Sequence, residues 1–163
     1  MNRNDIPLIP RKVLFGNPDR AAVQISPDGK HLAWLAPLDG VLNVWVAPRD
    51  DQEAARPVTH DAGQGIRIYQ WAYTNAHILF LQDKDGDENW RLYAADLDSN
   101  EAKDLTPFEG VQVQLIEVSY KSPAEVVVGL NNRDPKWHDV YRLNISTGEM
   151  VLLMQHDLSL IHI

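Results

Sequence analysis

The segments NVWV (43–46), RLYA (91–94) and DVYR (139–142) decide the fold, because each is a short strand-forming stretch with an aromatic residue near its centre. Trp45 precedes Tyr93 by 48 positions, and Tyr93 precedes Tyr141 by 48 again. A repeat of roughly 40 to 50 residues with several strands in each unit is typical of a β-propeller, in which each blade is one small antiparallel sheet. The spacing therefore predicts an all-β partial propeller of about three four-stranded blades.

Turn and strand signals on either side of these segments place the blades at about 21–62, 63–109 and 110–157. SPDG (26–29) is a turn, since its proline presets φ and its glycine adopts a conformation closed to β-branched residues. The expected strands are 22–25, 31–35, 41–46 and 57–59, then 69–73, 78–81, 90–94 and 103–106, then 115–120, 126–130, 139–143 and 150–153. Three blades fall short of the roughly 4 to 8 that close a propeller, so we expect further blades elsewhere in the protein.

The composition is that of a globular chain with an acidic surface. Its 163 residues, 44% of them hydrophobic, are enough for a real core. The net charge of −8 argues against nucleic acid and membrane as partners, because both attract clustered lysine and arginine. The chain has no cysteine, which excludes disulfides, thiolate nucleophiles and cysteine zinc sites, and we expect no metal or cofactor. The opening residues do not form a signal-peptide core, so we expect a cytoplasmic protein if translation starts at Met1.

A lead segment, residues 1–20, carries apolar residues that do not belong to the repeat. Its stretch IPLIPRKVLFGNP (6–18), with QISPDGK (24–30), VLNVWV (41–46) and DGDENWRLY (85–93), resembles the amino-terminal region of the prolyl oligopeptidase family of serine peptidases. The nearest branch is that of the dipeptidyl aminopeptidases and acylaminoacyl peptidases. The resemblance covers residues from about 5 to 157. The SPDG turn occurs in many propellers, and its combination with the lead segment and the acidic loop is more specific.

The resemblance implies a propeller that filters substrates for an α/β-hydrolase domain later in the protein. The lead segment is then expected to pack on that domain, and short peptides are the expected substrates. The nucleophilic serine of such a domain lies in G-x-S-x-G. No two of the nine glycines here are four residues apart, so this motif is absent. We therefore assign no catalytic, cofactor-binding or metal-binding residue to this chain, and we expect it to have no peptidase activity.

The alternative hypothesis is a non-enzymatic propeller of the Tol or WD type that binds a protein or peptide. Continuation of the protein distinguishes the two: further blades followed by G-x-S-x-G indicate the peptidase, and a stop after propeller closure indicates the binding protein. Substrate preference, exopeptidase or endopeptidase action, total blade number and oligomeric state are left open by these residues.

Several residue groups suggest chemistry but favour a structural interpretation. The acidic loop 83–88 lacks calcium-loop spacing, since its glycine falls at position four and position twelve is Ala94. Dipeptidyl peptidases can hold the substrate amino terminus with two propeller glutamates, but neither Glu117 nor Glu125 lies in a motif that matches that pair. Four of the five tryptophans lie within or at the ends of expected strands, and we expect them to pack in the core. This interpretation is least secure for Trp137, which lies in the expected loop 134–138. The tryptophans are Trp34, Trp45, Trp71, Trp90 and Trp137. The histidines, none expected to be catalytic, are His31, His60, His77, His138, His156 and His162.

The last six residues, LSLIHI (158–163), come shortly after the final expected strand, 150–153. They also read as the translation of a widely used transposase sequencing adapter. We therefore expect these six residues to be an artefact and the natural sequence to differ after Asp157.

Overall fold

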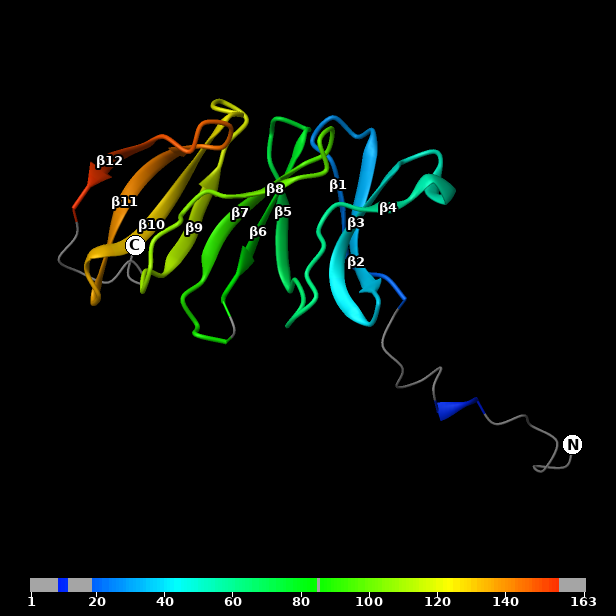
Figure 1. Cartoon of the computed structure of the whole chain (residues 1–163). Helices are drawn as coiled ribbons and strands as arrows, with labels where there is room; N and C mark the ends of the chain where they lie inside the picture. Colours follow the sequence, from blue (N-terminus) through cyan, green and yellow to red (C-terminus); the bar gives the residue numbers. More distant parts are fainter. Residues whose placement is uncertain (1–8, 12–18, 85, 156–163) are drawn as a thin grey trace, which may run out of the picture.

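The computed structural model describes residues 9–11, 19–84 and 86–155. Three four-stranded antiparallel sheets stand side by side in chain order (Figure 1). Blade 1 contains β1 (Ala21–Ile25), β2 (His31–Leu38), β3 (Val41–Pro48) and β4 (Arg56–Pro57), with the 3-10 turn η2 (Gln52–Ala54) before β4. Blade 2 contains β5 (Ile68–Trp71), β6 (His77–Gln82), β7 (Arg91–Asp96) and β8 (Ala102–Asp104). Blade 3 contains β9 (Val113–Val118), β10 (Glu125–Asp134), β11 (Trp137–Asn144) and β12 (Met150–Met154).

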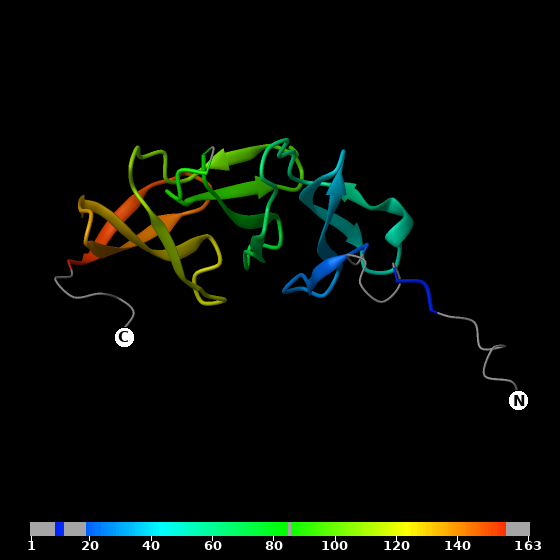
Figure 2. The same ribbon diagram turned by 90° about the horizontal axis from the view of Figure 1, so that it is seen from below.

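Each blade is a simple meander, in which every strand pairs with the next one along the chain. Seen from below, the three sheets fan out side by side (Figure 2). The first strands of blades 1 and 2, β1 and β5, contact each other directly. The predicted all-β partial propeller is confirmed. Within the described part of the chain, no helix is long and apolar enough to cross a membrane.

The repeated aromatic segments form the third strand of each blade. Trp45, Tyr93 and Tyr141 each pair with the fourth residue of the second strand in their blade. In blade 2, the Tyr93 ring stacks on Phe80 of the neighbouring strand, with ring centroids 5.2 Å apart. The 48-residue spacing therefore reflects one register position, repeated once in each blade.

The prediction of a loop over residues 134–138 is wrong in part. Strand β10 continues to Asp134 and β11 begins at Trp137, and these two residues are register partners. Only Pro135 and Lys136 lie between the strands, where the missing N–H of a proline breaks no ladder hydrogen bond. Trp137 is therefore a strand residue, and its side chain is half-buried.

The β1–β2 turn forms as the SPDG motif predicts. The hydroxyl oxygen of Ser26 accepts hydrogen bonds from the backbone N–H groups of Lys30 at 3.1 Å and His31 at 2.9 Å. Gly29 has a φ of +71°, a conformation that favours glycine. In the corresponding turn of blade 2, Asn75 adopts this conformation with a φ of +62°, as asparagine does more readily than other residues with side chains.

The hydrophobic core lies between the blades, in two separate clusters. The first joins blades 1 and 2 and contains residues such as Val44, Trp71 and Ile78. The second joins blades 2 and 3 and includes Leu92 and Val128, both fully buried. Because each sheet buries both faces only when it has two neighbours, the fold depends on the stacking of blades rather than on any single one.

In blades 1 and 2, a buried threonine near the fourth strand is hydrogen-bonded to the third strand. The Thr59 hydroxyl accepts a hydrogen bond from Val44 N at 2.8 Å, and the Thr106 hydroxyl accepts one from Leu92 N at 3.0 Å. In blade 3, Met154 lies opposite Val140, the residue that corresponds to Val44 and Leu92. A thioether cannot replace the hydroxyl as a strong acceptor, so β12 lacks this connection to β11.

A cation on the fourth strand of one blade contacts the turn before the fourth strand of the next. Arg56 Nη1 donates to Asn100 Oδ1 at 2.7 Å, and Arg56 Nη2 donates to the Leu97 carbonyl. Lys103, 47 residues later, donates from Nζ to the carbonyls of Ser146 at 2.9 Å and Thr147 at 3.0 Å. These contacts set neighbouring blades in register at their outer edge.

We expect Lys103→Met to weaken the contact between blades 2 and 3. The substitution keeps most of the aliphatic side chain but removes both hydrogen bonds, and solvent exposure limits the expected loss to about 1 kcal/mol of unfolding free energy. Urea-induced unfolding followed by tryptophan fluorescence measures the loss. Lys136→Met is the matched control, because Lys136 is exposed in the β10–β11 turn. Equal stability of the two variants would contradict a role for Lys103 between the blades.

Candidate functional site

The three blades present two different ends. One end, which we call the hairpin end, carries the β2–β3, β6–β7 and β10–β11 connections, and the chain enters blade 1 there (Figure 1). The opposite end, the turn end, carries the β1–β2, β5–β6 and β9–β10 turns and the loops before the fourth strands. In a propeller these two ends are where ligands and neighbouring domains meet the fold.

The acidic loop lies at the hairpin end, between β6 and β7, and its carboxylates bind their own backbone. Asp87 Oδ1 accepts hydrogen bonds from Asn89 N at 3.0 Å and Lys84 N at 3.3 Å. The hydrogen bond from the Asn89 backbone lowers the pKa of the Asp87 carboxyl. Glu88 N in turn donates to Asp83 Oδ2 at 3.3 Å. The loop is therefore shaped by local hydrogen bonds, and in the described residues no group of three His, Asp or Glu side chains could hold a metal ion.

The structure brings Glu117 and Glu125 to one hollow on the face of blade 3 that points away from blade 2. This hollow has a volume of about 270 Å³. Arg142 also lines it, and its Nε lies 3.6 Å from Glu125 Oε1. Glu117 and Arg142 lie on either side of Val127, as register neighbours in adjacent strands. The two glutamates thus share a charged surface with a cation between β9, β10 and β11.

The position of Glu117 corresponds to that of Gln24 in β1. Gln24 Nε2 donates to the Tyr69 carbonyl of the next blade at 3.0 Å. Burial also raises the pKa of the Tyr69 hydroxyl, which donates back to the Ala22 carbonyl. Glu117 therefore lies, like Gln24, on the face of its blade that is opposite to the preceding blade in the chain order.

The histidines of the described residues are spread over the blades. His77 makes the most contacts: its Nδ1 lies 2.9 Å from the Thr74 hydroxyl and its Nε2 lies 3.3 Å from Asp96 Oδ2. A hydroxyl, an imidazole and a carboxylate in this order resemble a catalytic triad, but the three residues close a turn. The backbone N–H of Ser99 lowers the pKa of Asp96 and occupies its other carboxylate oxygen. His156 and His162 lie outside the described residues.

Of the four tryptophans that the sequence predicts to be core residues, Trp34 and Trp71 are buried, and Trp45 and Trp90 are half-buried. Trp34 is 3% exposed and Trp71 is 4% exposed. The guanidinium of Arg20 covers the Trp34 ring at 4.4 Å from its centroid, which is within the range of a cation–π contact. These rings therefore serve packing between and around the blades and are not available for ligand stacking.

Two curated proteins are similar to almost the whole chain. Dipeptidyl aminopeptidase BIII of Pseudoxanthomonas mexicana is 52% identical over 150 residues, which is 92% of this chain and 22% of that protein. Dipeptidyl peptidase family member 6 of Caenorhabditis elegans is 32% identical over 158 residues, which is 93% of this chain and 21% of that protein. The chain thus spans about a fifth of the length of these curated relatives. No protein-family model matches the chain.

Solved structures share the fold at lower sequence identity. The β-propeller domain of the Trilobed protease from Pyrococcus furiosus matches with a TM-score of 0.58 and 19% identity, over 84% of this chain and 44% of that one. TolB from Acinetobacter baumannii matches with a TM-score of 0.56 and 21% identity, over 85% of this chain and 33% of that one. Peptidase propellers and TolB therefore have the same blade architecture as this chain, and their likeness to it concerns the fold alone.

Proposed function

We propose, because this chain corresponds to the amino-terminal propeller region of the prolyl oligopeptidase family, that it forms part of the substrate filter of a serine-type peptidase that hydrolyses short peptides. The observation that carries the proposal is the 52% identity to a dipeptidyl aminopeptidase over 150 residues. That identity extends over all three blades. The Tol-type alternative has support from fold likeness at 21% identity and from no curated relative of similar strength.

In this proposal the chemistry belongs to a hydrolase domain that the 163 residues do not contain. Its serine would attack the peptide carbonyl, activated by a histidine and an aspartate, and an oxyanion hole would hold the tetrahedral intermediate. The propeller contributes exclusion and positioning: a stiff wall of stacked blades restricts access to small substrates. Residues 1–20 would pack on the hydrolase domain, and blades beyond the third would cover the face that carries Glu117 and Glu125. We also propose a cytoplasmic location, which follows from the sequence expectation for translation that starts at Met1.

The experiment compares this chain with the protein encoded by the uninterrupted genomic reading frame. We expect residues 1–157 to hydrolyse dipeptidyl and acylaminoacyl fluorogenic substrates no faster than a buffer blank does. The longer protein should hydrolyse one of these classes and react with a fluorophosphonate probe, and replacement of the serine in G-x-S-x-G by alanine should abolish both. Hydrolysis by residues 1–157 alone, or a frame that ends without G-x-S-x-G, would refute the proposal.

A further inference from the structure

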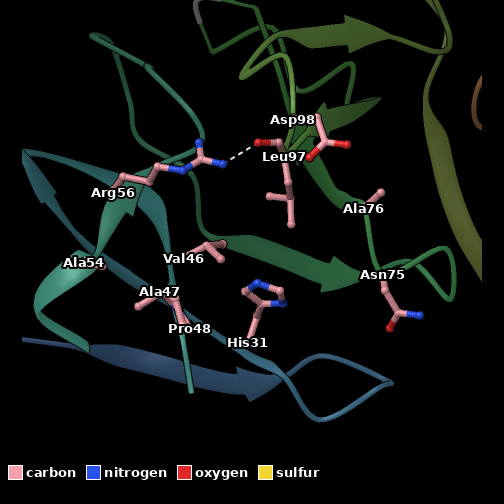
Figure 3. A pocket seen from close by; sticks show the side chains of 10 residues that line it. All are labelled: His31, Val46, Ala47, Pro48, Ala54, Arg56, Asn75, Ala76, Leu97 and Asp98. Carbon is pink, nitrogen blue, oxygen red and sulfur yellow. Dashed lines mark hydrogen bonds between the residues drawn. The ribbon is translucent and has the colours of Figure 1, made fainter. Parts of the chain in front are cut away.

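A cavity of about 310 Å³ lies at the turn end, between blades 1 and 2 (Figure 3). Apolar side chains such as Val46, Ala76 and Leu97 line it, and His31, Arg56 and Asp98 supply polar groups. Its size is at the lower end of the range for small-molecule sites, which are mostly apolar with a few convergent polar groups. Both blades that form it are present in this chain, so its walls do not depend on further blades.

His31 has a buried ring nitrogen with no protein partner. Its Nδ1 atom makes no hydrogen bond within the described residues. The corresponding histidine of blade 2, His77, contacts Thr74 with Nδ1 and Asp96 with Nε2. In blade 1 the register partner of His31 is Pro48, where that of His77 is Asp96, so the carboxylate is missing. The Nδ1 atom is itself closed off from solvent, so a ligand in the cavity meets other atoms of the His31 ring.

Arg56 brings a positive charge to the same cavity. Its guanidinium is held by two neutral oxygen atoms, Asn100 Oδ1 and the Leu97 carbonyl. Within the described residues, no carboxylate forms an ion pair with it. Neutral acceptors fix the guanidinium in position but leave its charge uncompensated, and a planar guanidinium is well suited to bind a carboxylate.

Asp98 lies at the rim of the cavity, on the turn before β8. Its backbone N–H donates to Asp96 Oδ1 at 2.9 Å, which holds the turn in place. A carboxylate here repels a purely anionic ligand but attracts an ammonium group. Figure 3 shows the Arg56 guanidinium and the Asp98 carboxylate on one side of the cavity and the His31 ring on the other, with the apolar side chains of Val46 and Leu97 between them.

From these features we propose that the cavity binds a small zwitterion, namely a free amino acid or dipeptide. Its carboxylate pairs with Arg56, its ammonium group lies near Asp98, and an apolar side chain contacts Val46, Leu97 and the His31 ring. The inference concerns residues of this chain only, and it holds whether or not the whole protein is a peptidase.

The test is a titration of the ¹⁵N-labelled 163-residue chain with the dipeptide Ala-Leu, followed by NMR. We expect saturable shifts of the His31 ring nitrogens and of the Arg56 side chain, with a dissociation constant in roughly the millimolar range or tighter. Carboxy-amidated Ala-Leu should bind about tenfold more weakly, because it lacks the partner of Arg56. N-acetylated Ala-Leu should also bind more weakly, because it lacks the ammonium group.

Variants separate this site from adventitious binding. Arg56→Met and Asp98→Asn should each weaken binding, and Asp98→Asn changes only a rim side chain, so it keeps the test valid if Arg56→Met fails to fold. Lys103→Met is the matched control, since Lys103 holds the equivalent place at the next interface and lies outside this cavity. Absence of a His31 shift, equal binding of the amidated and free peptides, or an equal loss in Lys103→Met would overturn the proposal.

Discussion

Leu92→Ala should lower the free energy of unfolding by about 2–5 kcal/mol, because it opens a cavity at the centre of the interface between blades 2 and 3. The Leu92 side chain is fully buried and belongs to the cluster that includes Val113, Val128 and Leu143. Its backbone is held on both sides, since Leu92 N donates to the Thr106 hydroxyl and the Leu92 carbonyl accepts from Leu105 N. The strand therefore cannot shift to fill the space. Pulse proteolysis across a urea gradient measures the loss.

Leu152→Ala is the control for this prediction. It removes the same atoms, but Leu152 lies in the outer strand β12 with 44% of its surface exposed. Less apolar area is returned to water and no closed cavity forms, so the expected loss is below about 1 kcal/mol. If both variants lost equal stability, the tight packing between blades 2 and 3 would be absent in solution.

The blade repeat could be predicted from the sequence because its signals are local and periodic. The third strand of each blade is a short run with an aromatic residue, and the spacing of 48 residues keeps that residue in one register position. Turn chemistry placed the β1–β2 reversal, because the Ser26 hydroxyl and Gly29 are needed there whatever surrounds them. Twelve strands were expected, and each has a counterpart in the structure.

Features that arise from contacts between strands could not be predicted in the same way. Residues 134–138 look like a loop, because a proline and a lysine interrupt the apolar pattern. The structure extends the β10–β11 hairpin past Leu130 through an irregular register, which pairing with the opposite strand decides. The number of residues over which two strands pair depends on tertiary contacts, and strand propensity describes these contacts poorly.

The candidate cavity at the turn end was also missed, although a signal for it exists. His31 and His77 occupy the same place in blades 1 and 2, and only an alignment of the two blades shows Pro48 where Asp96 stands. The cavity itself, with Arg56 and Asp98 among its lining residues, depends on how two blades pack. The shared hollow of Glu117 and Glu125 is similar, since the sequence places both residues near the inner strands of blade 3 but not on one surface.

A single position near the hairpin end carries a polar residue in every blade, and in blades 2 and 3 this residue forms an ion pair. Asn43, Arg91 and Asp139 correspond, each two residues before the repeated aromatic. Asn43 is fully buried, and its Oδ1 accepts a hydrogen bond from the Thr59 hydroxyl. Asp139 is 1% exposed, and its carboxylate accepts two hydrogen bonds from Arg133, at 2.7 Å from Nε and 2.9 Å from Nη2. Such a bidentate pair is strong because both charges are hydrogen-bonded in a fixed geometry.

Arg133→Met should therefore destabilise the chain by about 3 kcal/mol at pH 7, because it leaves the buried carboxylate of Asp139 without its guanidinium. Asp139→Leu should cost less, since 37% of the Arg133 side chain is exposed and its charge can turn to water. The double variant, with neither charge, should recover part of the loss of Arg133→Met. Pulse proteolysis at pH 7 measures the unfolding free energies of the two single variants and of the double variant. Additive losses in the double variant would show that the pair contributes through packing rather than through charge.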